Sequence, residues 1–438
     1  MAQHHKLSLF AAVLININIM IGAGVFINTT ELAQWAGALG VLSYVIIGII
    51  MLPLILSISR LLILHPTGGF YVFGSKEINQ FVGFLAAWSY FIGKLGSATI
   101  MIHVSVLFLQ KILPFLAQLH PFVLDFSFLS TFILCNMLNV KTGSQLQAIF
   151  TILKLTPIFF LAIFGLFLFK GNNFSSSYRI WEGIPFTIPL VLFSILGFEA
   201  ACSLSSRIEN PEKNASRAVL ISYGIVIFIY CIYQFVAFGA LAPNILHYLD
   251  YRSIFPGLIG KLFPHASYTQ TLVNMFHIAI ASSALSGSYS IIFSNTWNIY
   301  TLAEHKHLFF SSWFTSLNRH HIPWLCVLTE GLVCTIHLLV TQGAQVPLQL
   351  TGSLGCTIAY TLSILALLAA KKNYPQLRIN MFIPALGLCS CLLLLSSCIY
   401  TMYYAGLTAL ISLISLIIIG IIMFFTSNQH APVNVASK

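Results

Sequence analysis

Apolar segments about twenty residues long recur from one end of this chain to the other. A helix of that length crosses the hydrocarbon core of a bilayer, and only helices and closed barrels satisfy all backbone hydrogen bonds in lipid. Of the residues, 58% are hydrophobic and 7% are charged, whereas about a quarter are charged in soluble domains. The sequence therefore predicts an all-α polytopic membrane protein.

Hydropathy windows predict about twelve membrane spans. They cover residues 8–34, 38–63, 81–112, 122–138, 145–169, 185–205, 217–242, 269–302, 323–341, 348–370, 381–402 and 407–426. No long polar or repetitive stretch separates them, so residues 1–438 are expected to form one transmembrane domain. No small-residue cleavage site follows the start, so we expect the first span to be retained.

The formal net charge of +10 comes from basic residues that flank the spans, which favours contact with a lipid bilayer over nucleic acid. If the N-terminus is cytoplasmic, thirteen basic residues lie inside: Lys6, Arg60, Lys76, Lys141, Arg207, Lys213, Arg217, Lys306, Arg319, Lys371, Lys372, Arg378 and Lys438. Five lie outside: Lys111, Lys170, Arg179, Arg252 and Lys261. The positive-inside rule predicts that both termini are cytoplasmic, and we expect the cell (inner) membrane.

The first span is interrupted by glycines, in the run Ile21-Gly22-Ala23-Gly24-Val25-Phe26. A helix that breaks at bilayer depth must bury its freed backbone groups in protein or around a watery cavity. The N–H groups that open the second half-helix could hold a carboxylate. Close helix packing is the alternative use of such glycines.

The sixth span contains a second interruption, Phe193-Ser194-Ile195-Leu196-Gly197-Phe198-Glu199, after Pro185 and Pro189. Five spans separate the two interruptions. We therefore expect residues 8–169 and 185–370 to be two inverted repeats, followed by two additional helices over 381–426. Paired interruptions in corresponding spans point to a transporter's binding site, here formed by Ile21, Gly22, Ala23, Gly24, Val25, Ser194, Gly197 and Phe198.

These motifs resemble the amino acid–polyamine–organocation (APC) transporters. The glycine run is similar to that family's first-helix motif, and Gly197-Phe198-Glu199 resembles its sixth helix. Further similar stretches are Pro66-Thr67-Gly68-Gly69-Phe70-Tyr71, Asn139-Val140-Lys141-Thr142-Gly143 and Glu209-Asn210-Pro211-Glu212-Lys213. The chain departs from the family at Thr296-Trp297-Asn298 and Glu304-His305, and spans eleven and twelve match only in count and hydropathy. The resemblance implies a leucine-transporter-like fold with discontinuous helices 1 and 6.

Lys154 lies too deep in the fifth span to reach the interface easily. Charges at that depth are rare and functional by default, and burial disfavours the charged lysine. The resemblance implies that Lys154 couples transport to protons; the alternative is a fixed cation that ties helix five to the first-helix carbonyls. Ser282, Ser283 and Ser286 of the eighth span could approach Lys154 or act as interhelical hydrogen-bonding groups.

We weigh three more of the charges that fall within spans. Glu199 lies at the second interruption, where the resemblance implies gating and proton sensing, while a structural role remains open. Lys94 either faces the cavity and favours an anionic group or neutralises Glu199 or Glu31. Glu31 is either an outer-gate charge or solvated lining. Phe198 either shields the substrate or packs.

The sequence does not predict an enzyme. There are no paired carboxylates, no HExxH motif and no glycine-rich phosphate loop. The nine cysteines form no CxxC pair, so no zinc site is indicated, and we interpret His305, His307, His320 and His321 as solvated loop residues rather than metal ligands. We expect no catalytic residue and no cofactor.

The sequence therefore predicts secondary active transport of amino acids or related amines by alternating access, coupled to protons. An amino acid exchanger on the same fold is the alternative. A channel or solute sensor would keep the same pocket.

Overall fold

A computed structural model describes residues 8–66, 68–138, 144–175, 181–199, 208–247, 250–374 and 380–428. Helices form almost all of this part of the chain, and its only β-type pairing is an isolated bridge between Leu317 and Pro323. The helices outside the short 3-10 turns are α1 (Leu9–Met20), α2 (Gly24–Ala36), α3 (Gly40–Leu64), α4 (Phe70–Glu77), α5 (Gln80–Ile112), α6 (Pro114–Ala117), α7 (Pro121–Met137), α8 (Ser144–Phe164), α9 (Ile184–Ile195), α11 (Pro211–Leu241), α12 (Ile254–Leu262), α13 (Thr269–Glu304), α14 (Ser311–Phe314), α15 (Trp324–Thr341), α16 (Gln345–Asn373), α17 (Phe382–Ala405) and α18 (Leu407–Asn428).

The apolar helices confirm an all-α polytopic membrane protein. Within the described ranges, eight helices are long and apolar enough to cross a membrane, and the bent pair α1 and α2 makes a ninth span. The fourth, fifth and sixth predicted spans correspond to shorter apolar helices around α7, α8 and α9. Length alone thus supports eight to nine spans, and the count of twelve stays a prediction.

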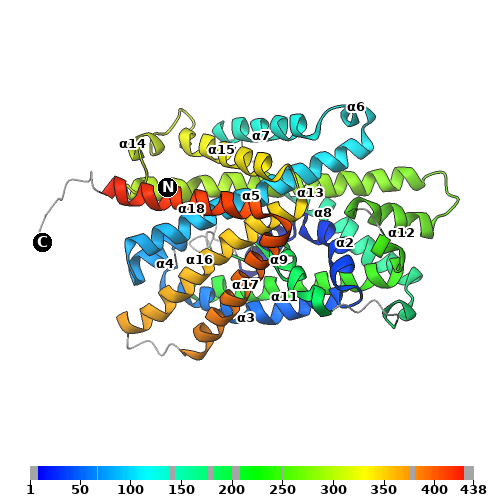
Figure 1. Ribbon diagram of the computed structural model, residues 1–438, viewed down its shortest axis with the longest axis horizontal. Coiled ribbons are helices and arrows are strands. Elements are labelled where there is room, and N and C mark those ends of the chain that lie inside the picture. Colours follow the sequence, from blue (N-terminus) through cyan, green and yellow to red (C-terminus); the bar gives the residue numbers. More distant parts are fainter. Residues whose placement is uncertain are drawn as a thin grey trace, which may run out of the picture.

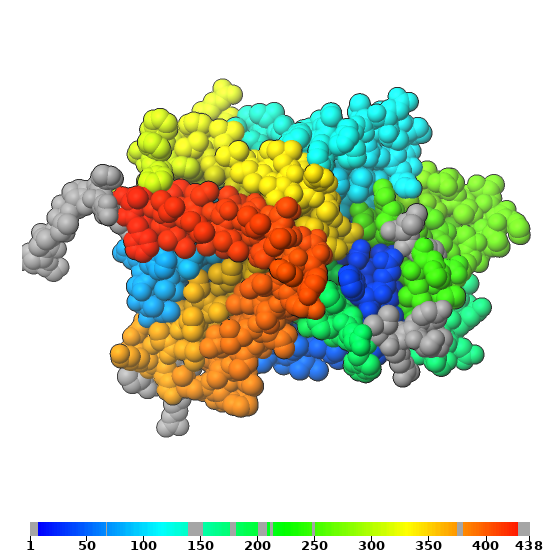
Figure 2. Space-filling view, in the orientation of Figure 1, coloured from blue at the N-terminus to red at the C-terminus, as the bar shows by residue number. Residues whose placement is uncertain are grey.

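Helix α5 is the centre of the bundle. It packs against α13, α16, α15 and α7, and most of its side chains are buried. Figure 1 shows α5 and α13 crossing the middle of the molecule, with α3 and α11 on one side and α7 and α15 on the other. Figure 2 shows α17 and α18, in orange and red, covering part of the viewed face.

Apolar side chains cover the outside of this bundle. Ile49, Phe228, Leu332 and Ile422 are each more than half exposed. Large exposed apolar surfaces are rare on soluble monomers and mark contact with a membrane or a partner. Together with the long apolar helices, they fit a protein whose outer surface faces lipid.

The predicted ends of the spans agree with the described helix ends to within a few residues, except at the end of the sixth span and the start of the seventh. Helix α9 ends at Ile195, whereas the predicted end at 205 lies outside the described residues. Helix α11 begins at Pro211, six residues before the predicted 217. Proline is well suited to the first position of a helix because the N–H that it lacks would have no partner there. The hydropathy window missed this turn because the turn carries the polar residues Glu212, Lys213 and Asn214.

Several predicted features lie outside the described residues. They include Asn139–Gly143, residues 200–207 after the second interruption, Thr67, and the basic residues Lys6, Lys141, Arg179, Arg207, Arg378 and Lys438. The relation between the repeats 8–169 and 185–370 therefore stays a prediction.

Candidate functional site

The first span is broken where the glycines predicted. Helix α1 ends at Met20, Ile21 is extended, and α2 begins at Gly24, with the two axes bent by 52°. Gly22 N donates to Met20 O at 2.9 Å instead of to Asn18 O. The carbonyl of Asn18 is therefore released from the regular i to i−4 pattern of the helix.

Several N–H groups at the start of α2 have no acceptor among the described residues. Ala23 caps the helix without a side-chain bond, and the amides of Ala23, Gly24 and Val25 donate to no backbone acceptor in the described part of the chain. All three residues are buried. Buried amides without acceptors at a helix N-terminus attract an anion, because the helix dipole adds to their own partial charge.

The second interruption lies against the first. Helix α9 ends at Ile195, Leu196 is extended, and Gly197 has a φ of +118° that L side chains rarely adopt. A Cβ on Gly197 would lie 3.2 Å from Ile19 O, and one on Gly24 would lie 2.7 Å from Ser194 Cα. Glycine is required at Gly24 and Gly197 because the two backbones touch there.

Asn28 of α2 joins the two broken segments. Its side-chain Nδ2 donates to Leu190 O at 2.6 Å and to Ser194 Oγ at 2.9 Å, both on α9. Asn28 is fully buried. Asn28, which the site prediction omitted, therefore connects the predicted site residue Ser194 to α2.

Replacing Asn28 with alanine should loosen this contact. Leaving a buried acceptor unsatisfied costs about 1–3 kcal/mol, so we expect a lower melting temperature together with weaker substrate binding. Asn373→Ala is a matched control, because Asn373 Nδ2 also donates to two acceptors, on Glu77. It should lower the melting temperature without weakening binding; equal loss of binding in both variants would contradict the role of Asn28.

Lys154 reaches the carbonyl that the first break releases. Its Nζ donates to Asn18 O at 2.7 Å, and the residue is 3% exposed. The described ion pairs do not include Lys154. Its described hydrogen bond is to Asn18 and not to Ser282 or Ser283; Ser283 is buried, and its Oγ has no partner among the described residues.

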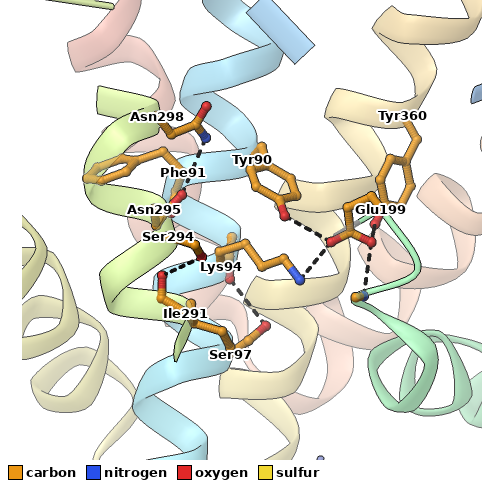
Figure 3. Close-up of polar contacts among 12 residues, drawn as sticks. Tyr90, Phe91, Lys94, Ser97, Glu199, Ile291, Ser294, Asn295, Asn298 and Tyr360 are labelled. Carbon is orange, nitrogen blue, oxygen red and sulfur yellow. Dashed lines mark hydrogen bonds and ion pairs between the residues drawn. The ribbon is translucent and has the colours of Figure 1, made fainter. Parts of the chain in front are cut away.

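Lys94 and Glu199 form a buried ion pair beside the second break (Figure 3). Lys94 Nζ lies 2.7 Å from Glu199 Oε1, and the side chains are 9% and 2% exposed. Tyr90 OH donates to the same oxygen at 2.9 Å, while Gly197 N and Tyr360 OH donate to Oε2 at 2.9 Å and 3.1 Å. Lys94 therefore contacts Glu199, while its role in transport stays a prediction.

Phe198 and Glu31, two further predicted residues, differ in burial. Phe198 is fully buried, with its ring 5.2 Å from that of Tyr360. Glu31 is partly exposed on α2 and contacts the side chain of Trp35. Lys94 does not pair with Glu31.

Comparison with known proteins adds the family. The family model described as Amino acid permease matches residues 7–435. This chain belongs to the amino acid permease family. The match confirms the resemblance to the APC transporters, and it supports a transporter.

Two curated relatives of the permease are antiporters by name. An arginine/ornithine antiporter of Latilactobacillus sakei is 30% identical over 259 residues, which are 55% of this chain and 54% of that protein. The alignment thus spans about half the length of this relative. The arginine/ornithine antiporter ArcD2 of Lactococcus lactis subsp. cremoris is 25% identical over 382 residues, 76% of this chain and 72% of that protein.

The sequence reasoning missed other polar residues inside the permease. Tyr90 lies one helical turn before Lys94, so the sequence spacing already indicated that the two side chains are neighbours. Tyr360 is 161 positions from Glu199, so the sequence gave no indication of their contact. Glu330 is fully buried and bonds Thr296 at 2.6 Å. As an acid within the predicted span 323–341, it met the same criterion that selected Lys154.

One histidine of the permease was interpreted wrongly. His307 is 1% exposed, and its Nε2 lies 2.8 Å from Tyr71 OH, so it is no solvated loop residue. The chain after α13 folds back onto α4 and α5, and His307 packs beside Phe84. His305 and His321 are exposed, as expected.

Proposed function

We propose that this permease moves amino acids or related amines across the membrane by alternating access around the two broken segments. The observation that carries the proposal is the contact of the breaks themselves, where Gly24 meets Ser194 and Gly197 meets Ile19. The buried amides of Ala23, Gly24 and Val25 would bind the substrate carboxylate. Broken helices at the membrane midplane form the substrate sites of this class of transporter.

Coupling to protons is the mechanism that Lys154 supports best. Among the described residues, Lys154 bonds a neutral carbonyl and no acid. A buried lysine charge without an acidic partner is energetically costly. Its protonated form braces α8 against the end of α1 through Asn18. If the two access states differ in this brace, their populations shift with proton concentration.

Exchange of one amino acid for another is the second candidate. It is favoured by the antiporter names of both relatives. The same binding site can serve symport or exchange. A permease is an exchanger when its binding site changes access only with a substrate bound.

The location of the termini and the arrangement of the repeats are also part of this proposal. We place both termini in the cytoplasm and the protein in the cell membrane, following the distribution of basic residues. Residues 8–169 and 185–370 are proposed as the inverted repeats, with 381–426 as the added helices. The breaks then occupy corresponding places in the two repeats.

Uptake into proteoliposomes tests the proposal. Labelled amino acids are offered to vesicles that are empty or preloaded with amino acid, each with and without an inward proton gradient. Symport requires concentrative uptake into empty vesicles under the gradient, abolished by a protonophore. Uptake only into preloaded vesicles would establish exchange, whereas binding without uptake in any condition would indicate a sensor and contradict transport.

A further inference from the structure

Glu199 has no acceptor capacity left for another cation. Each carboxylate oxygen already receives two donors: Lys94 and Tyr90 on Oε1, and Gly197 N and Tyr360 on Oε2. Figure 3 shows the lysine pointing at the carboxylate between the two tyrosines. Among the described ion pairs, this is the only one that joins a lysine to an acid.

The pair lies beside the second break, which the proposed function assigns to the substrate. Glu199 follows Gly197, whose backbone touches Ile19 and Met20 at the end of α1. Phe198, between them, packs on Tyr360. The ion pair therefore lies close to the break of the first span, whose α2 side carries the proposed carboxylate site. The net charge of the ion pair is zero.

We propose that Lys94 makes this permease selective for zwitterionic over cationic amino acids. An arginine or ornithine side chain needs a carboxylate in a buried pocket, because an uncompensated buried charge is expensive. Glu199 can serve it only by releasing Lys94, which would leave the lysine as the unpaired buried charge. A substrate with an apolar or neutral polar side chain enters without disturbing the pair.

The inference rests on the proposed transport function and names its substrate class. It sets this chain apart from its two relatives, which are named for cationic amino acids. Lys94 acts as a tethered cation that occupies the carboxylate in place of the substrate. Lys154 bonds Asn18 near the end of α1. When protonated it supplies a second cation beside the first break, which disfavours a cationic substrate further.

Reciprocal charge changes test this selectivity. Uptake of labelled alanine, arginine and glutamate is measured in proteoliposomes for the wild type, Lys94→Gln, Glu199→Gln and the double variant. Lys94→Gln leaves a free carboxylate and should raise the arginine-to-alanine ratio about tenfold, which corresponds to about 1.4 kcal/mol. Glu199→Gln leaves a free ammonium and should raise the glutamate-to-alanine ratio instead. The double variant restores neutrality, so both ratios should return toward wild type.

Lys111→Gln is the matched control, because Lys111 is an exposed lysine near the end of the same helix. It should leave all three ratios unchanged. If Lys94→Gln fails to fold, as judged by size exclusion, Glu199→Gln and the double variant still decide between the two outcomes.

Three results separate the possible failures. Wild-type uptake of arginine as efficient as that of alanine would overturn the inference while leaving transport intact. Unchanged ratios in both single variants would do the same. If no amino acid is taken up by the wild type, transport itself fails, and the same ratios measured by equilibrium binding then test the selectivity; absence of binding as well would overturn both.

Discussion

Replacing Lys154 with alanine is expected to preserve part of the substrate binding and to remove the stimulation of uptake by an inward proton gradient. The ammonium of Lys154 bonds the Asn18 carbonyl that the break in the first span releases. Alanine removes both the titratable group and this brace. Couplings of this kind typically change affinity about 5- to 150-fold, so we expect gradient-driven uptake to fall at least about fivefold.

The measurement compares initial uptake rates at equal and unequal pH across the vesicle membrane. Lys170→Ala is the control, since Lys170 is an exposed lysine beyond the end of the same span. It should retain the full stimulation. If Lys154→Ala still concentrates substrate when only the gradient drives it, Lys154 is structural, and coupling lies with Glu199 or is absent.

Replacing Gly24 with alanine is expected to reduce substrate binding far more than the same change at Gly22. A Cβ on Gly24 would lie 2.7 Å from the backbone Cα of Ser194, which cannot yield without moving α9. At Gly22 the near atom is the terminal methyl of Met101 at 2.8 Å, the mobile end of a flexible side chain. Overpacking costs about 1–3 kcal/mol, so binding at Gly24→Ala should weaken about 5- to 150-fold.

Equilibrium binding of labelled substrate to purified variants distinguishes the two positions. The larger change Gly24→Leu should abolish binding, because it fills the place where the backbones of α2 and α9 meet. Retained binding in Gly24→Leu would show that the substrate pocket is not at the break. Equal losses of binding affinity in Gly22→Ala and Gly24→Ala would contradict the explanation by backbone contact between Gly24 and Ser194.

The two interruptions could be predicted from the sequence because their causes are local. Two glycines within three residues at Gly22 and Gly24 weaken a helix wherever they occur, and Gly197 supplies a backbone conformation that other residues avoid. Lys154 was selected because a charge deep within a span is rare, and a contact with the first-helix carbonyls was one of the two roles considered for it. The hydrogen bond from Lys154 to Asn18 has this form, while its role in coupling stays a prediction.

The partners of Glu199 could not be predicted in the same way. Lys94 and Tyr90 come from α5 and Tyr360 from α16, so only packing of distant helices brings them together. The sequence left open whether Lys94 meets Glu199, Glu31 or a substrate, because charge alone does not choose a partner. His307 was misjudged for a related reason: a polar loop looks solvated until the fold places Tyr71 and Phe84 around it.

Accessibility of Ser194 tests alternating access at the breaks most directly. Ser194 is buried against Gly24 and Asn28 in this conformation. In a background whose nine cysteines are replaced and whose transport is retained, Ser194→Cys would be exposed to a membrane-impermeant thiol reagent from each side in turn. We expect labelling from both sides, slowed by substrate on either side and redistributed by pH. Labelling from one side only, or none while uptake continues, would contradict an alternating site between the two broken segments.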